Sequence, residues 1–197
     1  DLPTMRRAAA VAAQALGQAP LPCAPIADWA DMATLPPRCL PVRQLPGLLA
    51  PPAWGQVSAA AGRFAGDCVW WAANAALHGE VAAVVTAPLH KEAMAAGGAP
   101  YAQYPGHTEL LQAASAQYLG VPVADVPVRM MLANDELRVV LVSIHVGLRQ
   151  ALQLVTHEAV SETLRIADAS LRRMLGRAPR IWVAGLNPHA GEGGLFG

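Results

Sequence analysis

The chain has 197 residues, of which 54% are hydrophobic, and its 14 basic side chains balance 14 acidic ones. This length can bury a sizeable core, the composition excludes intrinsic disorder, and the zero net charge argues against nucleic acid or an anionic membrane as partner. Three cysteines without a CxxC pair fit the reducing cytoplasm better than a disulfide framework, and no apolar run is long enough to span a membrane.

The first 55 residues predict one helix followed by irregular chain. Residues 4–16 are rich in helix formers and stop at Gly17. Two arginines before an alanine run also resemble a signal peptide, but Gln14 cuts the apolar run short. More than half of the 17 prolines follow, in residues 18–55. Because proline removes a backbone donor, we expect extended chain there, with at most short edge strands.

The middle of the chain predicts helices around one buried strand. Apolar residues recur at spacings of three and four in residues 56–78, which indicates an amphipathic helix ended by Gly79. Residues 81–85 form a continuous apolar, largely β-branched run, as expected for a parallel strand buried on both faces. A turn with Lys91, a short helix and a second helix over residues 107–119 follow.

The last third predicts a hairpin, a long helical region and a final strand. Residues 128–133 and 137–145 read as strands, and their short polar connection indicates an antiparallel hairpin. Residues 148–175 form either one long helix or two helices joined near Thr156. Residues 180–186 read as the last strand, which leads into the motif NPHAGEGG.

This order of elements predicts an α/β fold, with a mostly parallel open sheet, helices on both of its faces and one antiparallel hairpin. Both ends of the chain look cut. It opens on Asp1 without an initiator methionine and stops in a glycine-rich loop that closes no element. We therefore expect a fragment of a longer protein that lacks both termini.

A first candidate site surrounds Lys91, His107 and Thr108. Open α/β sheets bind ligands beyond the carboxyl ends of their strands, and helix N-termini attract anions. Lys91 stands in the first turn of a helix, where the dipole disfavours a cation. An anionic ligand would explain this position, and a solvated lysine is the alternative. Simple N-capping explains part of the second motif, although capping does not require a histidine.

A second candidate site consists of His145 and His189, which end one predicted strand and follow another. Neutral imidazoles suit a catalytic divalent metal, which usually takes three protein ligands. The alternative is a pair of half-buried histidines that hydrogen-bond to the backbone. Two histidines leave the metal site incomplete, so the third ligand must come from outside this chain or from a partner.

Four motifs carry a resemblance to a known family: VVTAPLHKEAM, PGHTELL, MMLANDELRVVLVSIHVGL and GLNPHAGEGG, in this order. They resemble the 4-hydroxythreonine-4-phosphate dehydrogenases of pyridoxal phosphate biosynthesis. The resemblance implies a fold like that of isocitrate and isopropylmalate dehydrogenases, with two α/β domains and the active site in the cleft between them. Residues 1–55 would belong to the first domain, residues 56–197 would span the cleft, and the remainder of the enzyme would be missing.

The resemblance also implies an activity and roles for residues. Family members use NAD and a divalent metal (Zn, Mg, Mn or Co) to oxidise a phosphorylated small molecule, which then loses carbon dioxide. They are cytoplasmic homodimers that share the active site between subunits. By this resemblance His145 and His189 are metal ligands, and the neighbouring subunit supplies the third ligand. His107 and Thr108 contact the substrate, and we expect Lys91 to be catalytic.

Two departures from the family pattern keep other functions open. Ile144 stands where the family usually has threonine, and Gly147 where it usually has proline. Paralogues oxidise 4-phosphorylated sugar acids, threonate or erythronate, so a dehydrogenase of this kind is the second hypothesis. The third is a non-catalytic fragment that binds a phosphorylated ligand. In any of these cases we expect the 197 residues alone to be inactive as a dehydrogenase.

Overall fold

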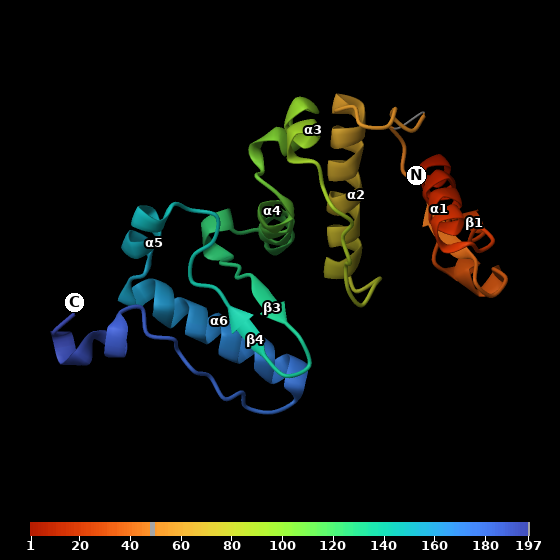
Figure 1. Ribbon diagram of the computed structural model, residues 1–197. Helices are drawn as coiled ribbons and strands as arrows, with labels where there is room; N and C mark the ends of the chain where they lie inside the picture. The colour runs from red at the N-terminus through yellow and green to blue at the C-terminus, as the bar shows by residue number, and fades with distance from the viewer. Residues whose placement is uncertain (48–49, 197) are drawn as a thin grey trace. The chain divides into compact units, whose positions relative to one another are not determined.

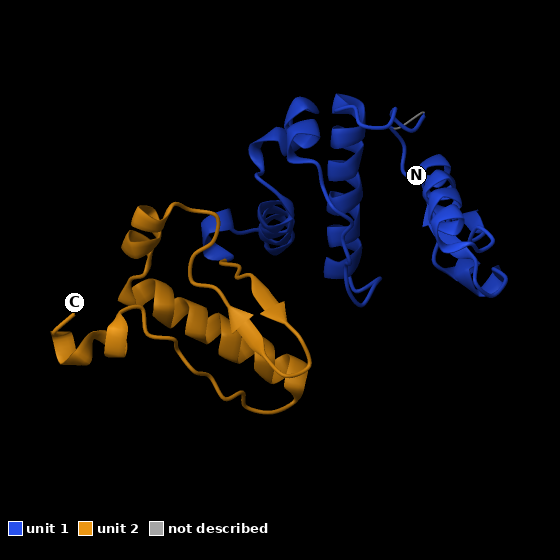
Figure 2. Cartoon of the chain, in the orientation of Figure 1, with its two compact units in different colours: residues 1–126 blue, residues 127–197 orange. Residues whose placement is uncertain are grey.

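The computed structural model describes residues 1–47 and 50–196. The chain divides into two compact units, Asp1–Val126 and Pro127–Gly197 (Figure 2). Helices make up most of the regular structure in both units, and each unit holds one pair of short strands (Figure 1). No helix within the described residues combines the length and the apolar character that crossing a bilayer requires.

The first unit begins with α1 (Leu2–Leu16), β1 (Cys23–Ile26), a 3-10 helix η1 (Ala30–Thr34) and β2 (Leu40–Arg43). The carboxylate of Asp1 caps α1 by accepting from the backbone N–H of Thr4, and Gly17 ends it in the left-handed conformation. β1 and β2 pair in parallel, and α1 packs against both. The predicted helix is confirmed, and so is the expectation of only short strands in the proline-rich stretch.

Three further helices complete the first unit: α2 (Ala59–Leu77), α3 (Lys91–Ala96) and α4 (His107–Leu119), with the 3-10 helices η2 (Tyr101–Gln103) and η3 (Val123–Asp125). Ser58 caps α2, and the left-handed Gly79 follows its end, as the sequence predicted. α2 packs against α3 and α4. Met94, Tyr101 and Leu110 form the buried cluster between these elements.

Two glycines of α2 allow this close packing. A Cβ on Gly62 would lie 1.9 Å from the backbone oxygen of Ala93, and one on Gly66 would lie 2.4 Å from Cδ2 of Tyr101. No side chain fits at either distance, so any larger residue would push α3 or η2 away from α2. The position of Lys91 at the start of α3 therefore depends on these two glycines.

The second unit holds β3 (Met131–Ala133), β4 (Arg138–Val140), α5 (Leu148–Leu154), α6 (His157–Leu175) and a 3-10 helix η4 (Pro188–Gly194). β3 and β4 form the predicted antiparallel hairpin, with Met131 opposite Val140. Thr156 caps α6 by accepting from the N–H of Ala159, so the helical region is two helices joined at this residue.

The sheet prediction is wrong for two segments. Residues 81–85 and 180–186 are irregular, with bends at 81, 82 and 186, and neither pairs with a strand of the described residues. Val85 is 95% exposed and Trp182 is 89% exposed. A buried parallel strand requires neighbours on both sides, and a run of apolar residues cannot by itself show where those neighbours come from. The α/β class is confirmed, with one small parallel pair and one antiparallel pair in place of the open sheet.

Candidate functional site

The start of α3 combines a structural histidine with an exposed lysine. Nδ1 of His90 accepts a 3.1 Å hydrogen bond from the backbone N–H of Ala93 and thereby caps the helix. This ring nitrogen is engaged by the backbone. Lys91 is the first residue of α3, and its side chain is exposed to solvent. Capping therefore occupies one ring nitrogen of His90, whereas Lys91 presents its ammonium group at an exposed position.

The start of α4 has no side-chain cap. Its N-cap is Gly106, in an extended conformation, and no side chain within residues 1–47 and 50–196 makes a capping hydrogen bond there. His107 and Thr108 are the first two helical residues and are half-buried, so neither occupies the capping position. Capping therefore does not account for this motif. The uncapped N–H groups and the positive end of the helix dipole would favour an anion at this end of α4.

Lys91 extends to this same helix start. A Cβ placed on Gly106 would lie 3.7 Å from Cε of Lys91 and 3.6 Å from Oε2 of Glu109. Lys91, His107 and Thr108 therefore lie in one region of the first unit, although they come from two helices. Glu109 is a further charged residue here. An acidic residue is common in the first turn of a helix, so the sequence did not indicate that Glu109 lies beside Lys91.

The other two predicted site residues, His145 and His189, lie in the second unit and share an uncommon backbone conformation. Their φ angles are 56° and 52°, and both side chains are exposed. For residues other than glycine the left-handed region costs on the order of 1–2 kcal/mol, and such strain occurs preferentially at functional sites. Among the described residues the non-glycine positions with positive φ are Arg38, His145, His189, Ala190 and Glu192.

The segment around His189 forms a tight left-handed turn. His189 to Gly193 all have positive φ, and the side-chain amide of Asn187 donates a 2.6 Å hydrogen bond to the carbonyl oxygen of Phe196. Nδ1 of His189 lies 3.7 Å from Oε2 of Glu192, and its ring stacks on Phe196 with 6.4 Å between centroids. The sequence assigned no role to Glu192. It lies three positions after His189, and this spacing indicates a contact only when the left-handed turn between them is known.

The imidazoles of His145 and His189 suit a divalent metal, but two ligands do not complete a metal site. Exposed imidazole nitrogens are common ligands of zinc and related ions. In the part of the chain that the structure describes, no three His, Cys, Asp or Glu side chains lie close enough together to hold an ion. A divalent ion bound by His145 and His189 would need at least one further ligand.

Burial raises the pKa of two titratable groups in the first unit. Burial raises the pKa of the Cys68 thiol, which keeps it protonated and unreactive. Burial also raises the pKa of Tyr101, and its hydrogen bond to Asp67 raises it further. Neither group is poised to transfer a proton near neutral pH, so neither is a catalytic candidate.

Comparison with protein families gives one match over almost the whole chain. Residues 3–197 match the family model described as pyridoxal phosphate biosynthetic protein PdxA. A 4-hydroxythreonine-4-phosphate dehydrogenase of Beijerinckia indica is 48% identical over 147 residues, which is 74% of this chain and 40% of the relative. A D-threonate 4-phosphate dehydrogenase of Salmonella typhimurium is 45% identical over 145 residues, 73% of this chain and 40% of the relative.

Solved structures agree with these relatives. A 4-hydroxythreonine-4-phosphate dehydrogenase from Klebsiella pneumoniae superposes with a TM-score of 0.79 at 37% identity, over 98% of this chain and 55% of that one. A second, from Burkholderia phymatum, gives a TM-score of 0.72 at 37% identity, over 94% of this chain and 52% of that one. The chain spans about 40% of the length of the curated relatives it matches.

Proposed function

The chain belongs to the family of the pyridoxal phosphate biosynthetic protein PdxA, and we propose that the full-length protein oxidises 4-hydroxythreonine 4-phosphate with NAD. The β-keto acid that results would then lose carbon dioxide. The observation that carries this proposal is the family match over residues 3–197, together with the 48% identical dehydrogenase of that name. Because the chain spans about 40% of such relatives, residues 1–197 alone are expected to be inactive.

A D-threonate 4-phosphate dehydrogenase is the second candidate. The relative with this name is 45% identical, almost as similar as the first. The two substrates share the C4 phosphate and the C3 hydroxyl and differ at C2, where one carries an amino group and the other a hydroxyl. The specificity question therefore reduces to which residues contact C2.

We assign the anionic end of the substrate to the start of α4. The uncapped first turn, with His107 and Thr108, would donate hydrogen bonds to a phosphate or carboxylate oxygen. Lys91 lies beside Gly106 at this helix start, and its ammonium group would stabilise negative charge that develops during the reaction. This is the role that we propose for Lys91 as a catalytic residue.

We assign His145 and His189 as two ligands of the divalent metal, on the basis of their imidazole chemistry and their strained, exposed positions. When bound, the ion would lower the pKa of the substrate hydroxyl. The remaining ligand would come from a partner subunit in a cytoplasmic homodimer. We also propose a two-domain arrangement like that of isocitrate and isopropylmalate dehydrogenases, with residues 1–55 in the first domain and residues 56–197 spanning the cleft.

The test is NADH formation by the full-length protein with each of the two phosphorylated substrates, in metal-free buffer and after addition of Zn, Mg, Mn or Co. His145→Ala and His189→Ala should each lower metal content in elemental analysis. His157→Ala, an exposed histidine at the start of α6, serves as the control and should change nothing. No turnover of either substrate with any metal would refute the proposed activity. Unchanged metal content in both variants would refute the ligand assignment alone.

A further inference from the structure

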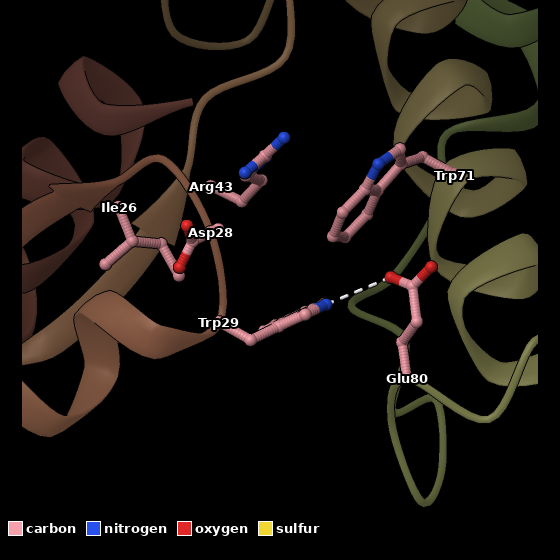
Figure 3. A pocket seen from close by; sticks show the side chains of 6 residues that line it. All are labelled: Ile26, Asp28, Trp29, Arg43, Trp71 and Glu80. Carbon is pink, nitrogen blue, oxygen red and sulfur yellow. Dashed lines mark hydrogen bonds between the residues drawn. The ribbon is translucent and has the colours of Figure 1, made fainter.

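A cavity of 390 Å³ lies in the first unit, beside β1, β2 and α2 (Figure 3). Six residues line it: Ile26, Asp28, Trp29, Arg43, Trp71 and Glu80. Its volume falls near the lower end of the range for small-molecule sites, roughly 300–1,000 Å³. None of the six belongs to the residues that we propose for the dehydrogenase site.

Two tryptophans form the aromatic part of this cavity. Nε1 of Trp29 donates a 3.0 Å hydrogen bond to Oε2 of Glu80, which fixes the orientation of the indole (Figure 3). The rings of Trp29 and Trp71 lie 5.7 Å apart between centroids, at an angle of 34°. At this spacing no flat ligand fits between the two rings. A ligand would instead meet their outer faces, which attract cations through the ring quadrupole.

The two carboxylates of the lining each keep one oxygen for a ligand. Oδ1 of Asp28 accepts from the backbone N–H groups of Ala30 and Asp31, at 2.7 and 3.3 Å. Glu80 uses Oε2 for Trp29. Within residues 1–47 and 50–196, Oδ2 of Asp28 and Oε1 of Glu80 accept no hydrogen bond. Both can therefore receive donors from a bound molecule.

Arg43 supplies the opposite charge. Its guanidinium makes neither a hydrogen bond nor an ion pair with any part of the chain that the structure describes, and Arg43 is exposed at the cavity. In Figure 3 the Arg43 side chain comes from β2 and Glu80 follows α2, on opposite sides of the space. Asp28 lies on the same side as Arg43 in Figure 3, and Glu80 lies across from them, so the cavity offers a cationic group together with carboxylate oxygens.

We propose that this cavity binds a small zwitterion with an ammonium and a carboxylate group, such as a free amino acid or a betaine. A simple anion would meet the carboxylates of Asp28 and Glu80, and a simple cation would meet Arg43. A zwitterion pairs with both: its carboxylate with the planar guanidinium, and its ammonium with the carboxylates and the indole faces. This site is additional to the dehydrogenase site and does not depend on that assignment.

Calorimetric titration of the full-length protein tests the proposal with three probes: glycine betaine, tetramethylammonium and acetate. Glycine betaine should bind at least roughly tenfold more tightly than either single-charge probe, because acetate lacks the cation that meets the carboxylates and indole faces, and tetramethylammonium lacks the carboxylate that accepts hydrogen bonds from Arg43. Arg43→Gln should weaken glycine betaine by a similar factor and should strengthen tetramethylammonium. Arg38→Gln, an exposed arginine outside the cavity, is the matched control and should leave all three affinities unchanged.

Two results would overturn the proposal: no heat from glycine betaine at millimolar concentration, or equal binding of glycine betaine before and after Arg43→Gln. Glu80→Gln provides a second, independent variant, which should weaken glycine betaine and tetramethylammonium together. Dehydrogenase activity of the Arg43 variant should equal that of the unmodified protein, which separates this site from the proposed active site.

Discussion

The hydroxyl of Tyr101 donates a 2.7 Å hydrogen bond to Oδ1 of Asp67 and so joins η2 to α2. The two residues are 34 positions apart in sequence, and Tyr101 is almost completely buried. Gly66 lies directly under the ring, where a Cβ would clash with it. This contact holds the segment between α3 and α4, and therefore the spacing of Lys91 from His107.

The Tyr101 contact predicts a loss of stability in alkaline solution. Burial, and then the bond to Asp67, raise the pKa of Tyr101 in the folded chain. In the unfolded chain the Tyr101 phenol ionises at its ordinary pKa of about 10. Above this pH the unfolded chain therefore binds fewer protons than the folded chain, and unfolding becomes more favourable. The stabilisation is complete below about pH 10 and is lost as the pH rises further. Urea unfolding above this pH should show a steeper decline for the unmodified protein than for Tyr101→Phe.

Tyr118→Phe is the control for this measurement, because Tyr118 is 48% exposed and its phenol has no such acceptor among the described residues. It should follow the unmodified protein. The Tyr101→Phe protein should also be less stable at neutral pH, by about 1–3 kcal/mol, since a hydrogen bond to a carboxylate is lost. Parallel pH profiles for all three proteins would contradict the prediction.

Replacement of Gly62 by alanine should show whether helix propensity or packing decides the stability of α2 at this position. In an exposed helix alanine is more stable than glycine by roughly 1 kcal/mol. At Gly62, however, the new Cβ would lie 1.9 Å from the carbonyl oxygen of Ala93, and backbone cannot move aside cheaply. We therefore expect Gly62→Ala to lower the free energy of unfolding by about 2 kcal/mol or more. Ala60→Gly, at an exposed position of the same helix, should cost no more than about 1 kcal/mol.

Removal of Arg129 should destabilise the second unit. Its Nε donates a 2.8 Å hydrogen bond to Oγ1 of the buried Thr163, and its terminal nitrogens reach the carbonyl of Val128 and the carboxylate of Glu162. Arg129→Met keeps the apolar stem but leaves Thr163 without this donor, so unfolding should be easier by about 1–3 kcal/mol. Arg172→Met breaks only an exposed pair with Asp168 and should change the free energy of unfolding far less than Arg129→Met.

His107→Ala tests the proposed substrate contact. Loss of one well-placed polar contact at the start of α4 should lower kcat/KM of the full-length enzyme by roughly 100-fold. Metal content should stay unchanged, because His107 is not a proposed ligand. Loss of metal with a normal KM would show that the roles assigned to the histidines are wrong.

Local signals explain why the helices could be predicted. Ser58 and Thr156 cap the helices that follow them, and Gly79 and Gly176 lie just past the ends. Each of these effects acts within one helical turn, so a short stretch of sequence contains all the information. The hairpin was predictable for the same reason, since its strands are neighbours in the chain.

Partners distant in sequence could not be predicted in the same way. Residues 81–85 have the composition of a buried strand, but pairing depends on chain elsewhere. The grouping of Lys91 with the start of α4 followed from the order of the helices. Even the nearby residues His189 and Glu192 could not be paired from the sequence, because their 3.7 Å contact depends on a left-handed turn. The cavity lined by Arg43 and Trp71 is formed by segments that share no sequence motif, so the spacing of these residues does not predict a cavity.

The apolar run at residues 81–85, which pairs with no strand of the described residues, has a consequence for handling the protein in solution. It is uncharged and largely β-branched, and Val85 at its end is almost fully exposed. Such a segment can recruit the same segment of another molecule through backbone hydrogen bonds, which is how cross-β aggregates begin. Residues 1–197 expressed alone should therefore precipitate as their concentration rises, and a lysine in place of Val85 should keep them dispersed.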